Sequence, residues 1–237
     1  MFWHEARDRY KRVTADDEDV KKFLELSHRF QEDLYEGITG AVCDLGHRWV
    51  AARTPAGKIL EIGFGSGRHS LFFSRQREDY FPSEMSPVHA TSPLWSGVLG
   101  RVLRCDARTL PFGDGTFKAV ISLYNLEHIL ELRQVFCEVH RVLDSDGRFL
   151  IALPCEGGLT WNIGRELTTR RHFQRKYGIN YDKVIAFEHV RDLRGVLEEL
   201  RMSRRFVVDT VRFLPLGLPS VHLNLIACLQ CSKKNGG

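Results

Sequence analysis

The chain has 237 residues, a formal net charge of +4 and 43% hydrophobic residues, which suits one globular domain with a full core. No uninterrupted apolar run approaches the roughly 20 residues of a membrane span, and the N-terminus lacks the apolar core of a secretory signal. Six scattered cysteines favour free thiols in a reducing compartment. We therefore expect a cytoplasmic protein with no membrane span, no disulfide framework and no metal site.

The N-terminal part of the chain predicts helices. Apolar residues recur at helical spacing from Glu18 to Leu34, and the same period continues from Val42 to Trp49. The Pro and Gly residues of "RTPAGK" then end this pattern. We expect residues 1–57 to form a helical cover and residues 58–237 to form the main domain.

Beyond this point, short apolar runs alternate with helix-like stretches. The strand-like runs are "KILEIG", "DYFPSE", "RVLRCDA", "FKAVISLY" and "RFLIALP", and "LELRQVFCEVHRVL" between the last two has a helical period. A last helix, "EHVRDLRGVLEELRM", precedes two final strands, "RFVVDTVRF" and "LNLIACLQC". This alternation predicts an α/β fold built from βαβ units around a parallel sheet.

The first strand ends in "ILEIGFGSGRHSLFFS", in which Gly63, Gly65 and Gly67 alternate with other residues. A strand, a glycine-rich turn and then the helix-like "SLFFSRQ" are typical of a nucleotide-type site, because glycine lets the main chain approach a ligand closely. The spacing is not that of a dinucleotide site, since Arg68 stands where the third glycine is needed, and no Gly-Lys-Ser/Thr triplet of a Walker loop follows. Dinucleotides, ATP and GTP are therefore disfavoured.

Glu61 precedes these glycines, and the run E-x-G-x-G-x-G resembles the first motif of the class I S-adenosylmethionine-dependent methyltransferases of the type 11 kind. Glu84 follows 23 positions later, at the end of the next strand. There the family has an acid that binds both ribose hydroxyls, since a carboxylate accepts two strong hydrogen bonds side by side. "VLRCDARTLPFGDGTFKAVISLYNLEHI" and "VFCEVHRVLDSDGRFLIALP" also match, so the resemblance covers about residues 58–154.

The resemblance implies S-adenosylmethionine as cofactor, S-adenosylhomocysteine as product, and a Rossmann-like fold. That fold has a seven-stranded, mostly parallel sheet with helices on both faces and an antiparallel last strand. By resemblance, Asp106 binds the adenine amino group and the amide of Ala107 its ring nitrogen. The expected cofactor residues are Glu61, Gly63, Gly65, Gly67, Glu84, Met85, Asp106, Ala107 and Leu123. Lys118 and the turn from Asp144 to Gly147 depart from the family pattern at positions that do not touch its cofactor.

Several residues are candidates for work on the acceptor. His128 follows the fourth strand at the carboxyl edge of the sheet, where ligands of open α/β folds bind, and is the expected catalytic base for a hydroxyl acceptor. Tyr124 directly follows the same strand and is expected to line the methyl-transfer site, while His189 is a further candidate to face substrate. Cys155 is disfavoured as a nucleophile because it follows the fifth strand. "SLYNLEH" lacks the Asn/Asp-Pro-Pro-Tyr signature of enzymes that methylate base amino groups.

We expect residues 155–187 to be a substrate-cover insertion. The stretch from Thr160 to Lys183 carries six cations against two acids, which accounts for the whole net charge, and it contains four aromatic residues. Arg171, His172 and Tyr177 are the expected substrate residues. The pattern suits an anionic or saccharide-type small molecule, although a solvated amphipathic helix also explains it.

The predicted function is methyl transfer from S-adenosylmethionine to a small molecule. Two alternatives remain: an RNA or protein methyltransferase, and a protein that binds the cofactor without catalysis. Nucleic acid is disfavoured because affinity rises with the number of phosphates neutralised, and the excess positive charge is confined to one segment. We expect the N-terminal helices and the insertion to form a movable cover over the carboxyl edge of the sheet.

Overall fold

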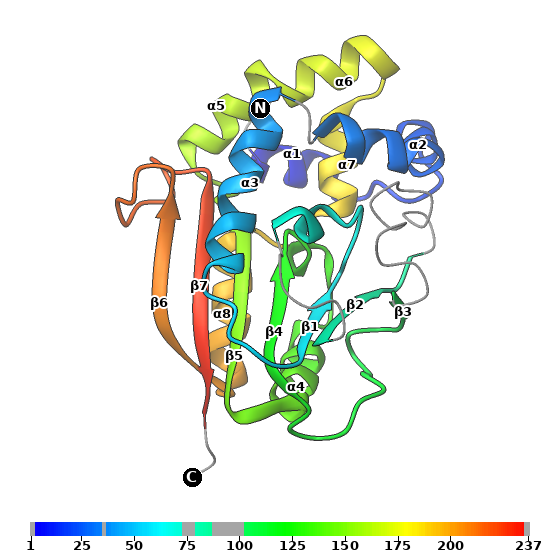
Figure 1. The fold of residues 1–237 in the computed structure, drawn as a ribbon. Helices are drawn as coiled ribbons and strands as arrows, with labels where there is room; N and C mark the ends of the chain where they lie inside the picture. Colours follow the sequence, from blue (N-terminus) through cyan, green and yellow to red (C-terminus); the bar gives the residue numbers. More distant parts are fainter. Residues whose placement is uncertain (1–2, 35–36, 73–78, 87–101, 235–237) are drawn as a thin grey trace.

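The computed structural model in Figure 1 describes residues 3–34, 37–72, 79–86 and 102–234. Its centre is a seven-stranded sheet of order β3-β2-β1-β4-β5-β7-β6. The strands are β1 Ile59–Ile62, β2 Tyr80–Glu84, β3 Leu103–Arg104, β4 Phe117–Leu123, β5 Leu143–Pro154, β6 Phe206–Leu214 and β7 Ile226–Lys233. Strands β1 to β5 pair in parallel, whereas β7 runs antiparallel to both β5 and β6. The predicted Rossmann-like sheet with an antiparallel last strand is confirmed.

Helices cover both faces of the sheet. On one face lie α4, Leu132–Val142, and α8, Leu193–Ser203, and on the other lies α3, Gly37–Ala51. Neighbouring residues of a strand point to opposite faces, so Cys228 and Cys231, three positions apart, belong to different core clusters. Strand β4 is almost wholly buried because both of its faces are covered.

The remaining α-helices gather over the carboxyl edge of the sheet, at the top of Figure 1. Two chain segments supply them: α1, Trp3–Tyr10, and α2, Glu18–Leu34, come before the sheet, and α5, Leu159–Leu167, α6, Thr169–Tyr177, and α7, Tyr181–Glu188, follow β5. We call these five helices the cap. It has a hydrophobic core of its own, in which Phe30 of α2 stacks on Phe173 of α6 with ring centroids 4.5 Å apart. None of the helices in the described ranges is long and apolar enough to cross a lipid bilayer.

Asp33 joins the two segments of the cap through polar contacts. Its carboxylate accepts hydrogen bonds from Lys176 at 2.7 Å, from His172 at 3.0 Å and from Tyr177 at 2.7 Å. Burial opposes ionisation of this carboxyl, but the three donors outweigh it and lower the pKa of Asp33 to about 2. The acidic end of α2 therefore neutralises part of the basic insertion.

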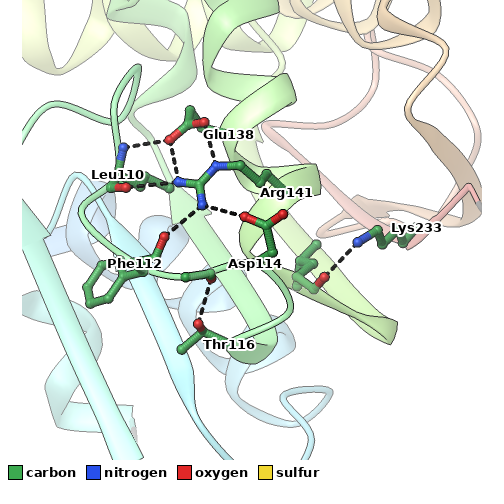
Figure 2. A network of polar contacts seen from close by, with 9 residues as sticks. Leu110, Phe112, Asp114, Thr116, Glu138, Arg141 and Lys233 are labelled. Atoms are coloured by element: carbon green, nitrogen blue, oxygen red, sulfur yellow. Dashed lines mark hydrogen bonds and ion pairs between the residues drawn. The ribbon is translucent and has the colours of Figure 1, made fainter.

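The loop between β3 and β4 is held by Arg141 of α4, as Figure 2 shows. The guanidinium donates to the carbonyl oxygens of Leu110 at 2.9 Å and Phe112 at 2.7 Å, and it pairs with the carboxylates of Asp114 at 2.9 Å and Glu138 at 2.8 Å. Glu138 also accepts the N–H of Leu110 at 2.7 Å. The planar fork of an arginine suits this array of acceptors better than the point charge of a lysine does.

The two departures from the family pattern compensate each other. The ammonium group of Lys118 lies 2.7 Å from a carboxylate oxygen of Asp144 and 2.6 Å from one of Asp146. An acid at position 118 would instead face two like charges, which repel. Lys118 and the two acids at the start of β5 therefore form a cluster of surface ion pairs. This cluster lies away from the carboxyl edge of the sheet.

We predict that Arg141→Ala lowers the free energy of unfolding by about 1–3 kcal/mol, because it removes the donors to two loop carbonyls and to two carboxylates. Urea unfolding measures the change. The matched control is Arg133→Ala on the same helix, where a mostly exposed arginine pairs with Glu199, and its cost is expected to stay below about 1 kcal/mol. Equal costs for the two variants would contradict the structural role of Arg141.

Candidate functional site

The loop after β1 has a backbone conformation that disfavours residues with a side chain. Gly63, Gly65 and Gly67 have φ angles of 73°, 53° and 83°, all in the left-handed region, where residues with a Cβ are disfavoured. A Cβ on Gly63 would also lie 2.2 Å from the side-chain carbon of Asn125. The loop is fixed to β2 by a hydrogen bond of 2.9 Å from the N–H of Phe64 to the backbone oxygen of Ser83, and it presents bare peptide groups at the sheet edge.

Glu84 stands against this loop at the end of β2. One oxygen of its carboxylate accepts the N–H of Gly65 at 2.9 Å, and the other accepts the N–H of Ser86 at 2.8 Å. A carboxylate has about four acceptor positions, so each oxygen can still accept a bond from a ligand hydroxyl. Met85, the neighbouring expected cofactor residue, is exposed. The arrangement suits a ribose that lies across the loop.

Asp106 and Ala107 follow β3 at the same edge. Arg108 donates its N–H to Asp106 at 2.8 Å and its guanidinium at 2.7 Å, and these bonds lower the pKa of the Asp106 carboxyl. Ala107 packs partly buried against the core, and Leu123 is buried at the end of β4. Because the carboxyl ends of parallel strands meet at one edge, β1 to β4 bring the expected cofactor residues together there.

Glu61 is buried beneath the glycine loop. Its carboxyl accepts a hydrogen bond from the hydroxyl of Tyr80 on β2, and its backbone oxygen accepts one from Ser83 at 2.8 Å. Burial raises the pKa of Glu61 to about 8, the charge of Glu84 adds to this, and the Tyr80 bond only partly opposes it. A buried acid with so displaced a pKa costs stability and is typical of a functional site.

Helix α3, on the face of the sheet, contacts both the residue after the glycine loop and the cavity. Its Asp44 receives two hydrogen bonds, of 2.9 and 2.8 Å, from the guanidinium of Arg68 just after the glycines. The hydroxyl of Tyr124 donates to the backbone oxygen of the neighbouring residue, Cys43, at 2.7 Å, and a Cβ on Gly46 would lie 2.2 Å from that hydroxyl. Sequence reasoning missed these contacts. A glycine in mid-helix was the one available signal of a close approach.

A cavity of about 330 Å³ lies between the cap and the ends of β4, β5 and β7. Tyr124 and His128 both line it, as do Glu127, Glu188 and His189. The apolar lining includes Phe23, Phe30, Val42, Trp161, Tyr181, Val184 and Ile226. Tyr124 directly precedes Asn125, the residue against the glycine loop, so the cavity and the loop flank the end of β4.

The other expected substrate residues lie outside this cavity. Arg171 and His172 line a separate, more open hollow with Asp33 and Lys176. Tyr177 lines neither space and donates its hydroxyl to Asp33. The structure therefore brings Tyr124 and His128 together and separates them from the basic residues of α6.

Residues that line the cavity, Glu127 and His189, lie next to buried groups that do not line it, Glu156 and Cys155. Glu156 follows β5, and an oxygen of its carboxyl group lies 2.7 Å from Nδ1 of His189, so the two groups form a hydrogen bond. Burial raises the pKa of Glu127 to about 7 and that of Glu156 well above its usual range, and it lowers the pKa of His189 to about 4. Cys155 is buried and its thiol pKa is raised to about 12 by desolvation, so it is a poor nucleophile. The disfavoured role for Cys155 agrees with this environment.

The chain matches known proteins over its central part. A family model described as the methyltransferase domain matches residues 60–151. YcgJ of Bacillus subtilis, an uncharacterized methyltransferase, is 33% identical over 125 residues, which cover 51% of this chain and 46% of YcgJ. An uncharacterized methyltransferase of Mycobacterium sp. (strain KMS) is 29% identical over 161 residues, 63% of this chain and 62% of the relative. The chain thus spans about half to three fifths of these two relatives.

A second Bacillus subtilis protein with a methyltransferase name, YrhH, is 32% identical over 123 residues, which cover 49% of this chain and 68% of YrhH. Among solved structures, a SAM-dependent methyltransferase of Thermotoga maritima has a TM-score of 0.59 at 15% identity and covers 90% of this chain and 99% of its own. The [4+2]-cyclase SpnF also has a TM-score of 0.59, at 17% identity, with coverages of 98% and 97%. The structural likeness shows the fold, and with the sequence matches it places the chain in the methyltransferase domain family of the class I S-adenosylmethionine-dependent methyltransferase superfamily.

Proposed function

We propose that the protein transfers a methyl group from S-adenosylmethionine to a small molecule held in the cavity beneath the cap. One observation carries this proposal: the bare glycine loop with Glu84 lies on one side of the end of β4, and a partly open cavity lies on the other. Asn125 touches the loop and Tyr124 lines the cavity. A donor on the loop and an acceptor in the cavity would therefore meet at this strand end.

The residues of the loop fit the cofactor of the family. Glu84 keeps acceptor positions for the ribose hydroxyls, Asp106 is ionised beside the adenine position, and the glycines leave peptide groups free of side chains. When bound, the cofactor supplies an electrophilic methyl group on a sulfonium. The protein then has to hold the acceptor close and in line with that methyl, which supplies much of the rate enhancement in such displacements.

A small acceptor is favoured over RNA because four of the six cations of the insertion are already paired with acids, Arg170 with both Glu166 and Asp182. Lys176 is bound to Asp33, Lys183 lies 2.9 Å from both Asp17 and Asp19, and the buried Arg165 pairs with Asp182 at 3.1 Å. Paired cations release few counterions on binding phosphates and so add little affinity for nucleic acid. The cap also covers the cavity, so we propose that it opens to admit the acceptor.

The fold by itself does not fix the reaction, as the cyclase SpnF illustrates. A non-catalytic cofactor-binding role is therefore the alternative that an activity measurement has to exclude. Incubating the protein with isotope-labelled S-adenosylmethionine and fractionated cell extract, followed by mass spectrometry, tests it. A labelled low-molecular-weight product is expected. Label on RNA or protein alone, or tight cofactor binding without transfer, would refute the small-molecule proposal.

We predict that Glu84→Ala weakens S-adenosylmethionine binding by about 10- to 100-fold, because two charge-assisted hydrogen bonds to the ribose are lost. Gly65→Arg is expected to abolish binding, since the new side chain fills the approach to the loop. Isothermal calorimetry measures both affinities, and Asp146→Ala, at an exposed position near the start of β5, is the control. Unchanged affinity in both loop variants, with unfolding midpoints like that of the wild type, would contradict this cofactor site.

A second prediction concerns Glu61, whose pKa of about 8 in the folded protein exceeds the usual 4.5. The unfolded chain ionises this acid above pH 4.5, whereas the folded chain keeps it protonated, so the wild type loses stability as pH rises from 4.5 to 8. Glu61→Gln removes this loss. The stability of the variant relative to wild type should therefore increase across this window by up to about 1 kcal/mol per pH unit.

Urea unfolding at pH 5, 6.5 and 8 measures this difference. Glu198→Gln, which makes the same change at an exposed position of α8, is the control and should show no such trend. The Glu61→Gln variant is also expected to bind S-adenosylmethionine more weakly. A stability difference that is constant between pH 5 and 8 would show that Glu61 is ionised in the folded protein.

A further inference from the structure

Two histidines meet on the floor of the cavity. His128 lies in the short 3₁₀ helix Leu126–His128 after β4, and His189 follows the end of α7. Their rings are nearly perpendicular, with centroids 4.6 Å apart. Both side chains line the cavity, so an acceptor held there touches a pair of imidazoles that come from two different parts of the fold.

The hydrogen-bond partner of His128 fixes which of its nitrogens carries the proton. Its Nδ1 lies 3.0 Å from the backbone oxygen of Glu188. A carbonyl oxygen only accepts hydrogen bonds, so Nδ1 must be the protonated nitrogen of the neutral ring. The lone pair is then on Nε2. His128 therefore has the tautomer that a base in this cavity needs, and it is set by the main chain.

Three acids surround this histidine. A carboxylate oxygen of Glu188 lies 3.8 Å from Nδ1 of His128. Glu127 and Glu156 are buried, and each has one carboxyl oxygen with no hydrogen-bond partner among the described residues. Burial raises the pKa of Glu127 and of Glu156 and so disfavours their charged forms. The Glu188 carboxylate is therefore the main group here that stabilises positive charge on His128 and repels a negative charge on a ligand.

The cations near this cluster are themselves held by acids or by backbone oxygens, although the charge of Arg165 also acts on Glu156 and His189. Arg165 is buried against Asp182, and its guanidinium lies 3.1 Å from that carboxylate. Arg191 donates to the backbone oxygen of Ile129 at 2.8 Å and lies 3.8 Å from Glu199. His189 shares its Nδ1 with Glu156. The floor is therefore rich in proton acceptors, while the walls are mostly aromatic and aliphatic.

On the basis of the methyltransferase function proposed above, we propose that the acceptor is an uncharged hydroxyl compound and that Nε2 of His128 takes the hydroxyl proton. The acceptor oxygen forms a bond to the methyl carbon as its proton moves to Nε2. The bond from that carbon to sulfur breaks, and its electron pair stays on the sulfur, which becomes a neutral thioether. The proton on His128 then passes to water.

This assignment follows from the balance of groups in the cavity. An acidic acceptor, such as a carboxylate or phosphate, would bring a second negative charge beside Glu188. Among the described residues the cation that lines the cavity is Arg165, and it is already bound to Asp182. An alcohol or phenol is a weak nucleophile until it loses its proton, so a positioned base is most useful for this class. Hydroxyl groups also donate to the unpartnered oxygens of buried acids, which lowers the cost of burying them.

The tautomer is tested by nitrogen-15 NMR of the histidine-labelled protein near pH 8. His128 is expected to be protonated on Nδ1. His140 is the internal control, because its Nε2 lies 3.1 Å from the backbone oxygen of Lys234 and it is expected to show the opposite tautomer. If His128 is protonated on Nε2, it has no lone pair to offer the acceptor, and the proposal fails.

The charge preference is tested with three probes of one skeleton: 2-phenylethanol, phenylacetate and phenethylammonium. Saturation-transfer NMR in the presence of S-adenosylhomocysteine measures their binding. The alcohol is expected to bind at least about tenfold more tightly than phenylacetate, and Glu188→Gln should reduce this preference while the control Glu198→Gln leaves it unchanged. Binding of phenylacetate equal to that of the alcohol, no binding by any probe, or a tenfold preference for the ammonium would each overturn the hydroxyl assignment.

The product of the labelling experiment gives the third test. The new methyl group is expected on oxygen, and His128→Gln should reduce labelling at least about 100-fold with an unchanged affinity for S-adenosylmethionine. A methyl group on nitrogen, carbon or sulfur, or full activity of His128→Gln, would refute the present inference and leave the methyltransferase function standing. Absence of any label would instead refute the function itself.

Discussion

The close approach between Gly63 and Asn125 constrains the whole site. Because no Cβ fits at position 63, the first strand can end against the turn that follows β4, and the main chain of the loop is left open to a ligand. The next residue back, Tyr124, has a positive φ of 52°, which turns its side chain to the cavity and to the backbone of Cys43. One contact between two strand ends thus sets the distance between the cofactor side and the acceptor side.

In the cap, the charges of one chain segment are neutralised by those of a distant segment. Helices α2 and α6 stack aromatic rings, and the acids of the N-terminal segment pair with the cations of the insertion. Partly exposed ion pairs contribute little free energy individually, so the aromatic core provides most of the stability of the cap. The ion pairs instead reduce the positive field that the composition of the insertion suggests, since they hold four of its six cations. Charge counted along the chain was therefore a poor guide to the charge that a ligand meets.

Local patterns predicted the sheet and the glycine loop well, because strand periodicity and glycine spacing are properties of neighbouring residues. Strand β4 and helix α2 begin or end where the periodicity places them, whereas β5 begins at Leu143, five residues before the predicted run. The stretch after the glycines was expected to be helical, and its described part, Arg68–Phe72, is a 3₁₀ helix. The insertion, for which one amphipathic helix was an open interpretation, forms three helices.

The site itself was less predictable because its parts come from distant segments. Glu156 and His189 are 33 positions apart, and Asp44 and Arg68 are 24 apart, so no local pattern joins them. Arg171 and Tyr177 attracted attention as a cation and an aromatic in a basic segment, yet they lie outside the cavity. The sequence identifies residue types suited to a task, and only tertiary packing decides which of them share a space.

Buried acids at the carboxyl edge indicate where this fold gives up stability. Glu61 lies beneath the glycine loop. On the other side of the β4 end, Glu127 lines the cavity and Glu156 contacts His189. Burial raises the pKa of all three carboxyl groups and so disfavours their ionised forms. An apolar residue of similar size would spare the desolvation of each acid. A ligand with hydrogen-bond donors can offset that cost when it is bound. Donors on a bound cofactor would act at Glu61, and donors on a bound acceptor would act at Glu127, so each ligand offsets the cost on its own side of the β4 end.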